Sequence, residues 1–152
     1  MNMEKCSDMK KIKIKFTDEK VYEEFNNISV GDWIDLKTID IVTIKEGQFR
    51  MIDLGVAMEL PEGYEAWIVP RSSTFMKYGV LQANSIAIID NSFRGNDDVL
   101  RFLVWATRDV TIPKGTRICQ FRIMKNQPEI DFIKVDKLEN ENRGGIGSTG
   151  EM

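Results

Sequence analysis

The chain has 152 residues, 42% of them hydrophobic, and its 21 basic and 24 acidic residues give a net charge of −3. This length and apolar content suit one domain whose core needs neither disulfides nor structural zinc, because Cys6 and Cys119 are isolated thiols. The mixed charges exclude a basic field for polymeric nucleic acid. Without a long apolar run or a secretory signal, we expect a cytoplasmic protein that does not bind membranes.

The predicted elements are mainly short strands divided by turns. Residues 11–16 alternate lysine with apolar side chains, which predicts a half-exposed edge strand protected by its lysines. Similar runs predict strands at 39–44, 49–54, 65–69, 86–89, 99–106, 117–123 and 131–135. Turn signals separate them at 45–47, 61–63, 94–98 and 113–115. This order favours an all-β fold, either a barrel or a jelly roll.

Two segments have helical features, namely residues 17–26 and a short stretch opened by Ser72 and Ser73 and closed by Gly79. A serine can cap the start of a helix and a glycine its end. After Leu138 the composition changes to mainly Glu, Asn, Arg and Gly. We therefore expect a β domain over residues 1–138 and a mobile, glycine-rich arm over residues 139–152.

The sequence contains no histidine. This absence removes the usual general base and the commonest metal ligand, so acid-base chemistry must use a carboxylate, lysine, tyrosine or cysteine. A catalytic metal bound only by oxygen ligands is expected to be magnesium.

Two segments have the composition of phosphate-binding loops. Gly144–Gly150 combines four glycines with Ser148 and Thr149, so its backbone N–H groups can converge on an anion, although a frayed terminus has the same composition. Arg71 is followed by two serine hydroxyls after an apolar strand, which suits phosphate, although an ordinary helix cap beside a surface arginine explains it equally well.

Two carboxylates have more than one interpretation. Asp90 ends the apolar run 86–89 and is either a turn-capping residue or a positioned base. Asp35 follows Gly31–Ile34 and belongs either to a turn or to a metal shell. In residues 117–122, alternation places Cys119 and Phe121 together in the core, with Gln120 on the other face or at the rim.

Five of these segments follow one another at 35–36, 70–73, 89–95, 115–120 and 144–150. In this order and with these gaps they resemble the five motifs of the trimeric deoxyuridine triphosphate nucleotidohydrolases (dUTPases), and the segment Gly55–Ala66 resembles bacterial and phage forms. The resemblance covers about residues 30–150. It implies a distorted jelly-roll β-barrel, assembled as a homotrimer, with active sites at subunit interfaces that the C-terminal arm closes.

The reaction implied by this resemblance is Mg²⁺-dependent hydrolysis of dUTP to dUMP and pyrophosphate, which keeps uracil out of DNA and supplies dUMP for dTMP synthesis. Asp90 would contact the 3'-hydroxyl and orient the water that attacks the α-phosphorus. Asp35 would reach the magnesium ion through a water molecule.

The resemblance also implies which residues bind the substrate. Residues Asn84 to Ile89 would form a β-hairpin whose backbone pairs with uracil, and Phe93 would pack on the deoxyribose. The phosphates would be held by the remaining motif residues, namely Arg71, Ser72, Ser73, Gln120, Gly147, Ser148 and Thr149.

The arm departs from the family pattern at two positions. The usual arginine and the usual uracil-stacking phenylalanine correspond to Glu141 and Ile146. Ile146 can cover a base but lacks the aromatic ring, so Phe93 or Tyr78 is a hypothesis for the lid role. Arg143 is a hypothesis for a replacement ligand of the γ-phosphate.

Two other functions remain as alternatives. A dCTP deaminase resembles this chain, but that chemistry requires a glutamate on the strand after Asp90, and residues 99–106 contain no acidic residue. A regulatory binding protein, such as a phage partner of a repressor, is the second alternative. The extended turn around Asp97, Asp98 and Arg101 is a candidate surface for a regulatory protein partner.

Overall fold

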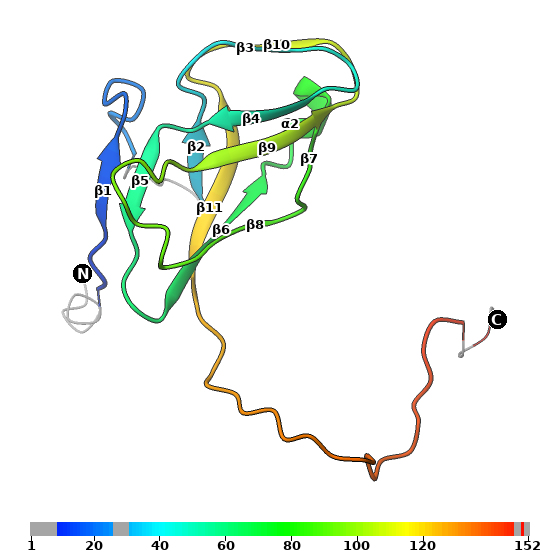
Figure 1. The fold of residues 1–152 in the computed structure, drawn as a ribbon. Helices are drawn as coiled ribbons and strands as arrows, with labels where there is room; N and C mark the ends of the chain where they lie inside the picture. The colour runs from blue at the N-terminus through cyan, green and yellow to red at the C-terminus, as the bar shows by residue number, and fades with distance from the viewer. Residues whose placement is uncertain (1–8, 26–30, 148–149, 151–152) are drawn as a thin grey trace.

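The computed structural model describes residues 9–25, 31–147 and 150. Its elements, in chain order, are β1 (Lys13–Phe16), β2 (Ile34–Lys37), β3 (Val42–Ile44), β4 (Phe49–Asp53), β5 (Val56–Glu59), β6 (Tyr64–Pro70), α2 (Thr74–Tyr78), β7 (Val80–Gln82), β8 (Ala87–Ile89), β9 (Arg101–Ala106), β10 (Val110–Ile112) and β11 (Arg117–Lys125) (Figure 1).

The strands form four antiparallel sheets, with the orders β2-β11-β6-β8, β4-β9-β7, β1-β5 and β10-β3. Strands that are distant in the sequence are neighbours, since β11 lies between β2 and β6. The sheets do not close into one continuous barrel. The all-β prediction of a distorted jelly roll is therefore confirmed.

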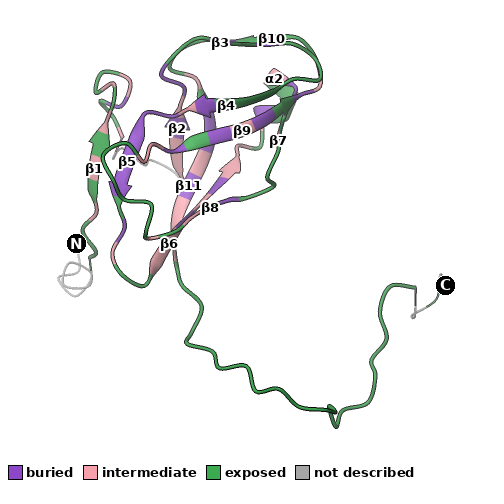
Figure 2. Ribbon diagram, in the orientation of Figure 1, coloured by how far each residue is buried: buried purple, intermediate pink, exposed green. Residues whose placement is uncertain are grey.

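One hydrophobic core joins the two larger sheets. Leu36, Ile68 and Phe121 come from the first sheet, and Ile52 and Phe102 come from the second, and all are buried in one cluster. The alternation of buried and exposed residues along β9 shows that its inner face packs on this core while its outer face does not (Figure 2). Burial of these apolar side chains is the main force that holds the sheets together.

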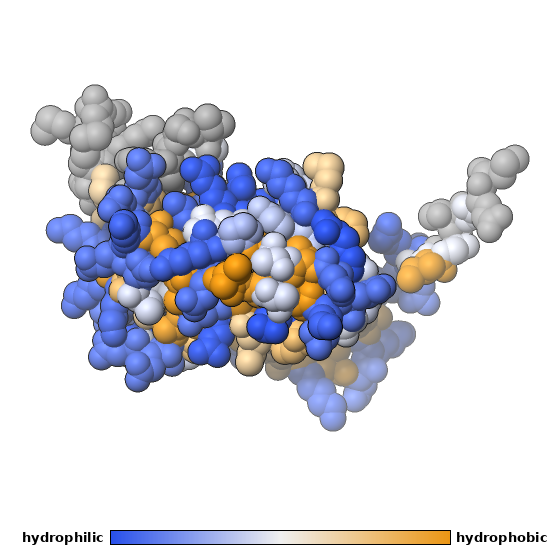
Figure 3. Space-filling view, turned by 90° about the horizontal axis from the view of Figure 1, so that it is seen from above, coloured by the Kyte–Doolittle hydropathy of each residue, from blue (hydrophilic) through white to orange (hydrophobic). Residues whose placement is uncertain are grey.

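The β3–β10 pair covers the top of the core. The inward side chains of these two strands, those of Val42, Ile44 and Ile112, are buried. Thr43 and Thr111 are paired on the outer face, with their hydroxyl oxygens 3.4 Å apart. Seen from this side, a hydrophobic centre is framed by hydrophilic residues (Figure 3).

The predicted strand at 131–135 is wrong. After β11 ends at Lys125, residues 126–147 contain no strand, are exposed, and run away from the sheets (Figures 1 and 2). Phe132 and Ile133 are 90% and 79% exposed. Their apolar pattern resembles that of a strand, but no neighbouring strand of the described chain pairs with it, and an unpaired strand leaves its backbone groups unsatisfied.

The helix predicted at 17–26 is wrong over its described part, because residues 19–25 form turns and residues 17 and 18 belong to no helix. Asp18 accepts backbone N–H bonds from Lys20 and Val21, and Tyr22 and Phe25 pack with Phe16 in an aromatic cluster. The Asp18 bonds have the pattern of a helix cap, but the backbone bonds that follow, from Tyr22 to Glu19 and from Phe25 to Tyr22, are those of separate turns. Among the described residues, no helix has the length and apolarity that crossing a membrane requires.

The second predicted helix is confirmed as α2, although its cap differs from the prediction. Gly79 ends α2 in the left-handed region with φ 63°, and its N–H donates to the Phe75 carbonyl at 2.7 Å. Ser73 precedes α2 but makes no side-chain cap hydrogen bond. The prediction that a serine side chain caps the start of α2 is therefore wrong.

Candidate active site

Three of the predicted residues meet where β2, β11 and β6 lie side by side. Asp35 on β2 is the cross-strand neighbour of Gln120 on β11, and Arg71 directly follows β6. Asp35 Oδ1 lies 3.1 Å from Arg71 Nε, and both side chains are about one-third exposed. Gln120 Nε2 donates to the Pro70 carbonyl, 3.2 Å away. We call these residues the phosphate end of the candidate site, because Arg71 and Gln120 are predicted from the sequence to bind phosphate.

A β-bulge adds Arg117 to the phosphate end. Between Arg117 and Cys119 the register of β11 against β2 shifts by one residue, so Ile118 and Cys119 are both buried. Arg117 consequently faces outward, with Nη1 3.8 Å from Asp35 Oδ2. Bulges beside functional sites often redirect a side chain in this way. The sequence motif contains Arg117, but strict alternation gives no sign of the bulge that brings it to Asp35.

Cys119 behaves as the sequence predicts. It lies in the core, and its burial raises the pKa of the thiol well above its ordinary value. A thiol held in its neutral form is a packing group and not a nucleophile, so Cys119 has no part in the chemistry of this site.

The loop between β6 and α2 carries Ser72 and Ser73. Ser72 is exposed and Ser73 is half-buried. Ser73 makes no side-chain cap hydrogen bond to α2. Thr74 Oγ1 instead reaches back and accepts the Arg71 backbone N–H at 3.0 Å. The Ser73 hydroxyl is therefore not used to start α2.

The second group of predicted residues lies around β8. Asn84 is exposed in the turn between β7 and β8, where Ser85 has φ 62° and the Ile86 N–H donates to the Asn84 carbonyl at 2.7 Å. β7 pairs with β9 and β8 pairs with β6, so β7 and β8 belong to different sheets. The segment 84–89 is therefore a tight turn leading into a strand and not a paired β-hairpin.

Asp90 is both a turn residue and an exposed carboxylate. Its Oδ1 accepts the Ser92 N–H at 2.8 Å, and its backbone carbonyl accepts the Phe93 N–H at 3.0 Å. Hydrogen bonds from the Ser92 hydroxyl and then from the Ser92 N–H hold the pKa of Asp90 below its ordinary value. Asn91 Nδ2 donates to the carbonyl of Leu60, the residue that follows β5, at 2.6 Å, which fixes this turn to the end of that strand.

A hollow of about 430 Å³ lies beside this turn. Asn84, Ile89 and Phe93 line it, together with Ala87, Ile88, Asp97, Asp98, Val99, Leu100, Arg101 and Leu103. Its walls are mostly apolar, with polar groups at its rim, as is usual for pockets that hold small organic ligands. We call Asn84, Ile89, Asp90 and Phe93 the nucleoside end of the candidate site, after the ligand that the family resemblance predicts for them.

The two ends of the site are far apart within one chain. Along β6, Ala66 pairs with Ile89 at one end and Pro70 pairs with Cys119 at the other. Asp90 and Arg71 lie beyond these two pairs. At about 3.3 Å per residue, the strand between them spans more than about 13 Å. One chain therefore does not bring its own Asp90 to its own phosphate end.

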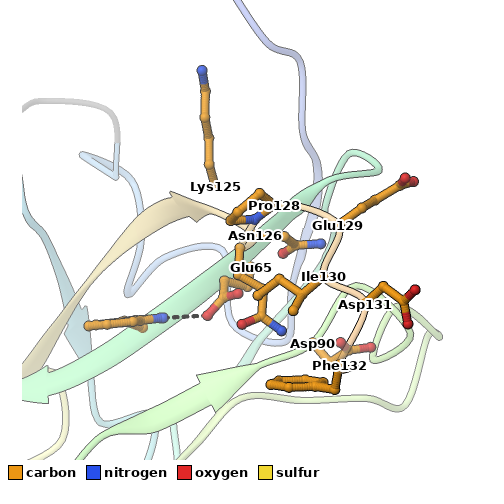
Figure 4. A pocket seen from close by; sticks show the side chains of 11 residues that line it. Glu65, Asp90, Lys125, Asn126, Pro128, Glu129, Ile130, Asp131 and Phe132 are labelled. Carbon is orange, nitrogen blue, oxygen red and sulfur yellow. Dashed lines mark hydrogen bonds between the residues drawn. The ribbon is translucent and has the colours of Figure 1, made fainter. Parts of the chain in front are cut away.

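A wider hollow of about 1250 Å³ lies between the sheets and the start of the arm (Figure 4). Four carboxylates line it, those of Glu65, Asp90, Glu129 and Asp131, against one lysine, Lys125. Glu65 Oε2 accepts the Trp67 indole N–H at 2.6 Å. Because like charges repel, this hollow does not suit a triphosphate.

Those arm residues that the structure describes do not meet either end of the site in this chain. Arg143, Ile146 and Gly147 are exposed on the arm, which runs away from the sheets (Figure 1). Ser148 and Thr149 lie outside the described residues. The structure thus joins the second and fourth motifs with Asp35 and leaves the third motif and the arm apart from them.

Comparisons with known proteins agree with this geometry. The family model of dUTPases matches residues 33–150. The chain is also 55% identical, over 139 residues, to the SPbeta prophage-derived deoxyuridine 5'-triphosphate nucleotidohydrolase of Bacillus subtilis. The aligned residues make up 91% of this chain and 97% of that protein. The chain belongs to the dUTPase family.

Other dUTPases resemble it less closely in sequence. The deoxyuridine 5'-triphosphate nucleotidohydrolase of Hydrogenobaculum is 36% identical over 143 residues, covering 92% of this chain and 98% of the relative. Among solved structures, the Staphylococcus bacteriophage 80alpha dUTPase with dUpNHpp matches with a TM-score of 0.75 and 17% identity, covering 93% of this chain and 99% of the other. The Streptococcus mutans dUTPase matches with a TM-score of 0.64 and 20% identity, covering 84% of this chain and 100% of the other. These structural matches support the jelly-roll fold.

Proposed function

We propose that this chain hydrolyses dUTP to dUMP and pyrophosphate. Membership of the dUTPase family and the names of the relatives support this activity. The observation that carries the proposal is the phosphate end, where Arg71 and Arg117 lie on either side of Asp35. Two guanidinium groups and one carboxylate leave a positive balance at the surface, which favours a bound triphosphate.

The phosphate end would hold the substrate by positioning and charge. Arg71 and Gln120 contact the phosphate chain, with Ser72 and Ser73 supplying hydroxyl donors beside it. Gln120 is already oriented by its bond to the Pro70 carbonyl. Groups fixed before the substrate arrives lose little freedom on binding, which favours catalysis by positioning.

Asp90 would orient the water that attacks the α-phosphorus and accept its proton. The lowered pKa of Asp90 keeps the carboxylate ionised at neutral pH, the form that this role requires. A depressed pKa means that the active form is lost only as the pH falls below the ordinary aspartate value of 3.8. Ser92→Ala should raise the pKa of Asp90, so the acidic limb of the profile of kcat/KM against pH should move to higher pH. An unshifted limb would assign the titration to another group.

Mg²⁺ fits this chemistry as a partner of the substrate. Among the described residues, no group of three or more acidic, cysteine or histidine side chains could hold a metal ion. The single carboxylate of Asp35 suits an ion whose other ligands are phosphate oxygens and water, as is usual for Mg²⁺. When bound, the ion would neutralise charge on the phosphates, while Asp35 would orient one of its water ligands.

The nucleoside end would select deoxyuridine. The hollow beside Phe93 has the size of a small ligand pocket. Phe93 would pack on the deoxyribose, and the backbone from Asn84 to Ile89 would pair with the uracil edge. Cytosine has the opposite donor and acceptor pattern at that edge, so it would leave buried groups unpaired.

The complete site would form between copies in a homotrimer. The separation of Asp90 from Arg71 along β6 supports this assembly, because a second chain must bring a nucleoside end to each phosphate end. The arm of residues 139–152 would close the site, with Ile146 covering uracil. Arg143, Gly147, Ser148 and Thr149 would clasp the γ-phosphate. We expect this enzyme to act in the cytoplasm.

The test is pyrophosphate release from dUTP, dCTP, dTTP and UTP in parallel, with Mg²⁺. Release from dUTP alone, lost in Asp90→Asn, would support the proposed reaction. Asp40→Asn is the matched control, because Asp40 is an exposed carboxylate in the segment before β3 and outside both ends of the site. Equal release from dCTP or no release from any nucleotide would reject the proposal.

A further inference from the structure

Thr74 is one of only two buried polar residues in the part of the chain that the structure describes. Its side chain is at the first position of α2, with 1% relative exposure. The Thr74 hydroxyl donates to the Ile118 carbonyl at 2.8 Å and accepts the Arg71 N–H at 3.0 Å. The Thr74 N–H also donates to the Arg71 carbonyl at 3.1 Å. One hydroxyl therefore joins the start of the phosphate loop to β11.

The position on β11 that Thr74 holds is the β-bulge. Ile118 is the residue between Arg117 and Cys119, where the register against β2 shifts. Its carbonyl is held by a buried bond, and in the low dielectric of the interior such a bond is stronger than one open to water. The conformation that directs Arg117 toward Asp35 is thus fixed from the side of α2.

Two further hydrogen bonds connect the same two segments. Gln120 Nε2 donates to the Pro70 carbonyl at 3.2 Å, and Arg71 Nη1 donates to the Arg117 carbonyl at 3.4 Å. Both are longer than the Thr74 bond and less buried, so water competes for their partners. The bond from the Thr74 hydroxyl to Ile118 is the most deeply buried of the three connections.

We propose that Thr74 is a positioning residue, whose hydroxyl sets the distance and orientation between Arg71 on the loop and the β11 residues Arg117 and Gln120. Thr74 itself touches no substrate. The proposal rests on the proposed function, because it assigns these three residues to one phosphate site. Displacing a binding group by about 1 Å can lower a rate by about 10²-fold, so loss of this bond should be visible in the kinetics.

The test compares two substitutions with opposite effects. Thr74→Val keeps the volume and removes the hydroxyl, and we expect kcat/KM for dUTP to fall by about 10- to 100-fold. Thr74→Ser keeps the hydroxyl and loses a buried methyl group, so we expect a lower Tm with kcat/KM within about threefold of the parent. A merely structural role would instead make the loss of activity follow the loss of Tm.

Thr38 provides a matched control. It is fully buried, and its hydroxyl also donates to one carbonyl, that of Pro113 at 2.9 Å, and accepts one N–H, that of Thr116 at 3.1 Å. Thr38→Val should lower Tm about as much as Thr74→Val while lowering kcat/KM much less. If Thr74→Val does not fold, Thr74→Ala compared with Thr74→Ser isolates the same hydroxyl.

A second measurement separates this proposal from the proposed reaction. Binding of inorganic tripolyphosphate with Mg²⁺, followed by calorimetry, reports on the phosphate site without hydrolysis. If the parent protein hydrolyses no nucleotide, the proposed reaction fails, while weaker tripolyphosphate binding in Thr74→Val but not in Thr74→Ser would still support the positioning role. Unchanged binding and kinetics in Thr74→Val, or equal losses in both variants, would overturn it.

Discussion

The two ends of β6 are built in different ways. At the phosphate end, Asp35, Arg71 and Gln120 lie on or beside three paired strands, and hydrogen bonds and ion pairs orient their side chains. At the nucleoside end, Asp90 and Phe93 lie in exposed turns. One chain therefore orients the residues that we propose to bind phosphate, whereas Asp90 and Phe93, which we propose to contact the nucleoside, are exposed to solvent, as a site shared between copies requires.

The largest expected effect tests whether the two ends act on different chains. Asp90→Asn and Arg71→Ala should each lose about 10²- to 10⁴-fold in kcat, because one lacks the base and the other a phosphate ligand. Subunits of the two variants that are unfolded and reassembled together should regain activity, up to about a quarter of the parent value for random pairing of intact ends. Pyrophosphate release from the mixture measures this.

Activity that stays lost in the mixed assembly would mean that each site belongs to a single chain. The control is the same mixing of Asp90→Asn with itself, which offers no intact nucleoside end.

The arm extends the comparison to a segment whose described residues are exposed in this chain. Ending the chain after Leu138 should lower kcat/KM by about two orders of magnitude, because the groups that close the site are removed. Tm should not change, since the described arm residues from 139 onward are exposed. A large fall in Tm would show that the arm packs on a neighbour for stability and not only for closure.

Arg117 tests how much of the phosphate end depends on the β-bulge. Arg117→Gln should lower kcat/KM about tenfold by removing a charged contact. Arg117→Lys should recover only part of the loss, because a lysine lacks the planar fork of donors. Arg50→Gln is the control, since Arg50 Nη2 donates to the Thr43 carbonyl on a different sheet. If kcat/KM of all three variants equals that of the parent, Arg117 takes no part in the site.

The smallest effect on activity is expected at Tyr22, which supports the phosphate end from the core. The Tyr22 hydroxyl donates to the Leu54 carbonyl at 2.6 Å and accepts the N–H of Lys37, two residues after Asp35 on β2, at 2.8 Å. Tyr22→Phe leaves these buried groups unpaired, so unfolding should become easier by about 1–3 kcal/mol, measured by urea denaturation. Tyr64→Phe should have little effect. A Tyr22→Phe protein as stable as the parent would contradict this role.

Local patterns in the sequence predict much of the fold. Gly47, Gly63 and Gly115 all adopt positive φ in the predicted turns, because glycine accepts that conformation without a steric penalty. The alternation in 99–106 and 117–123 predicts β9 and β11. Strands β2, β5, β7 and β10 are missed, since each has only three or four residues, too few for a clear pattern.

The remaining errors come from long-range contacts. The segment 131–135 has the pattern of a strand but finds no partner within the described chain. The role of Arg117 depends on a register shift that no local pattern reports. The sequence around Thr74 is that of an ordinary helix, and only the folded structure brings the Thr74 hydroxyl to the Ile118 carbonyl. The motif order identifies the family, whereas tertiary structure decides which residues meet.

The length of β6 also has a consequence for how the protein behaves in dilute solution. Because Asp90 and Arg71 lie at opposite ends of this strand, the proposed site is incomplete in a lone chain, whereas the proposed closed ring would have as many complete sites as chains. Specific activity should therefore fall on dilution as the assembly dissociates, and substrate that bridges two chains should oppose this loss by mass action.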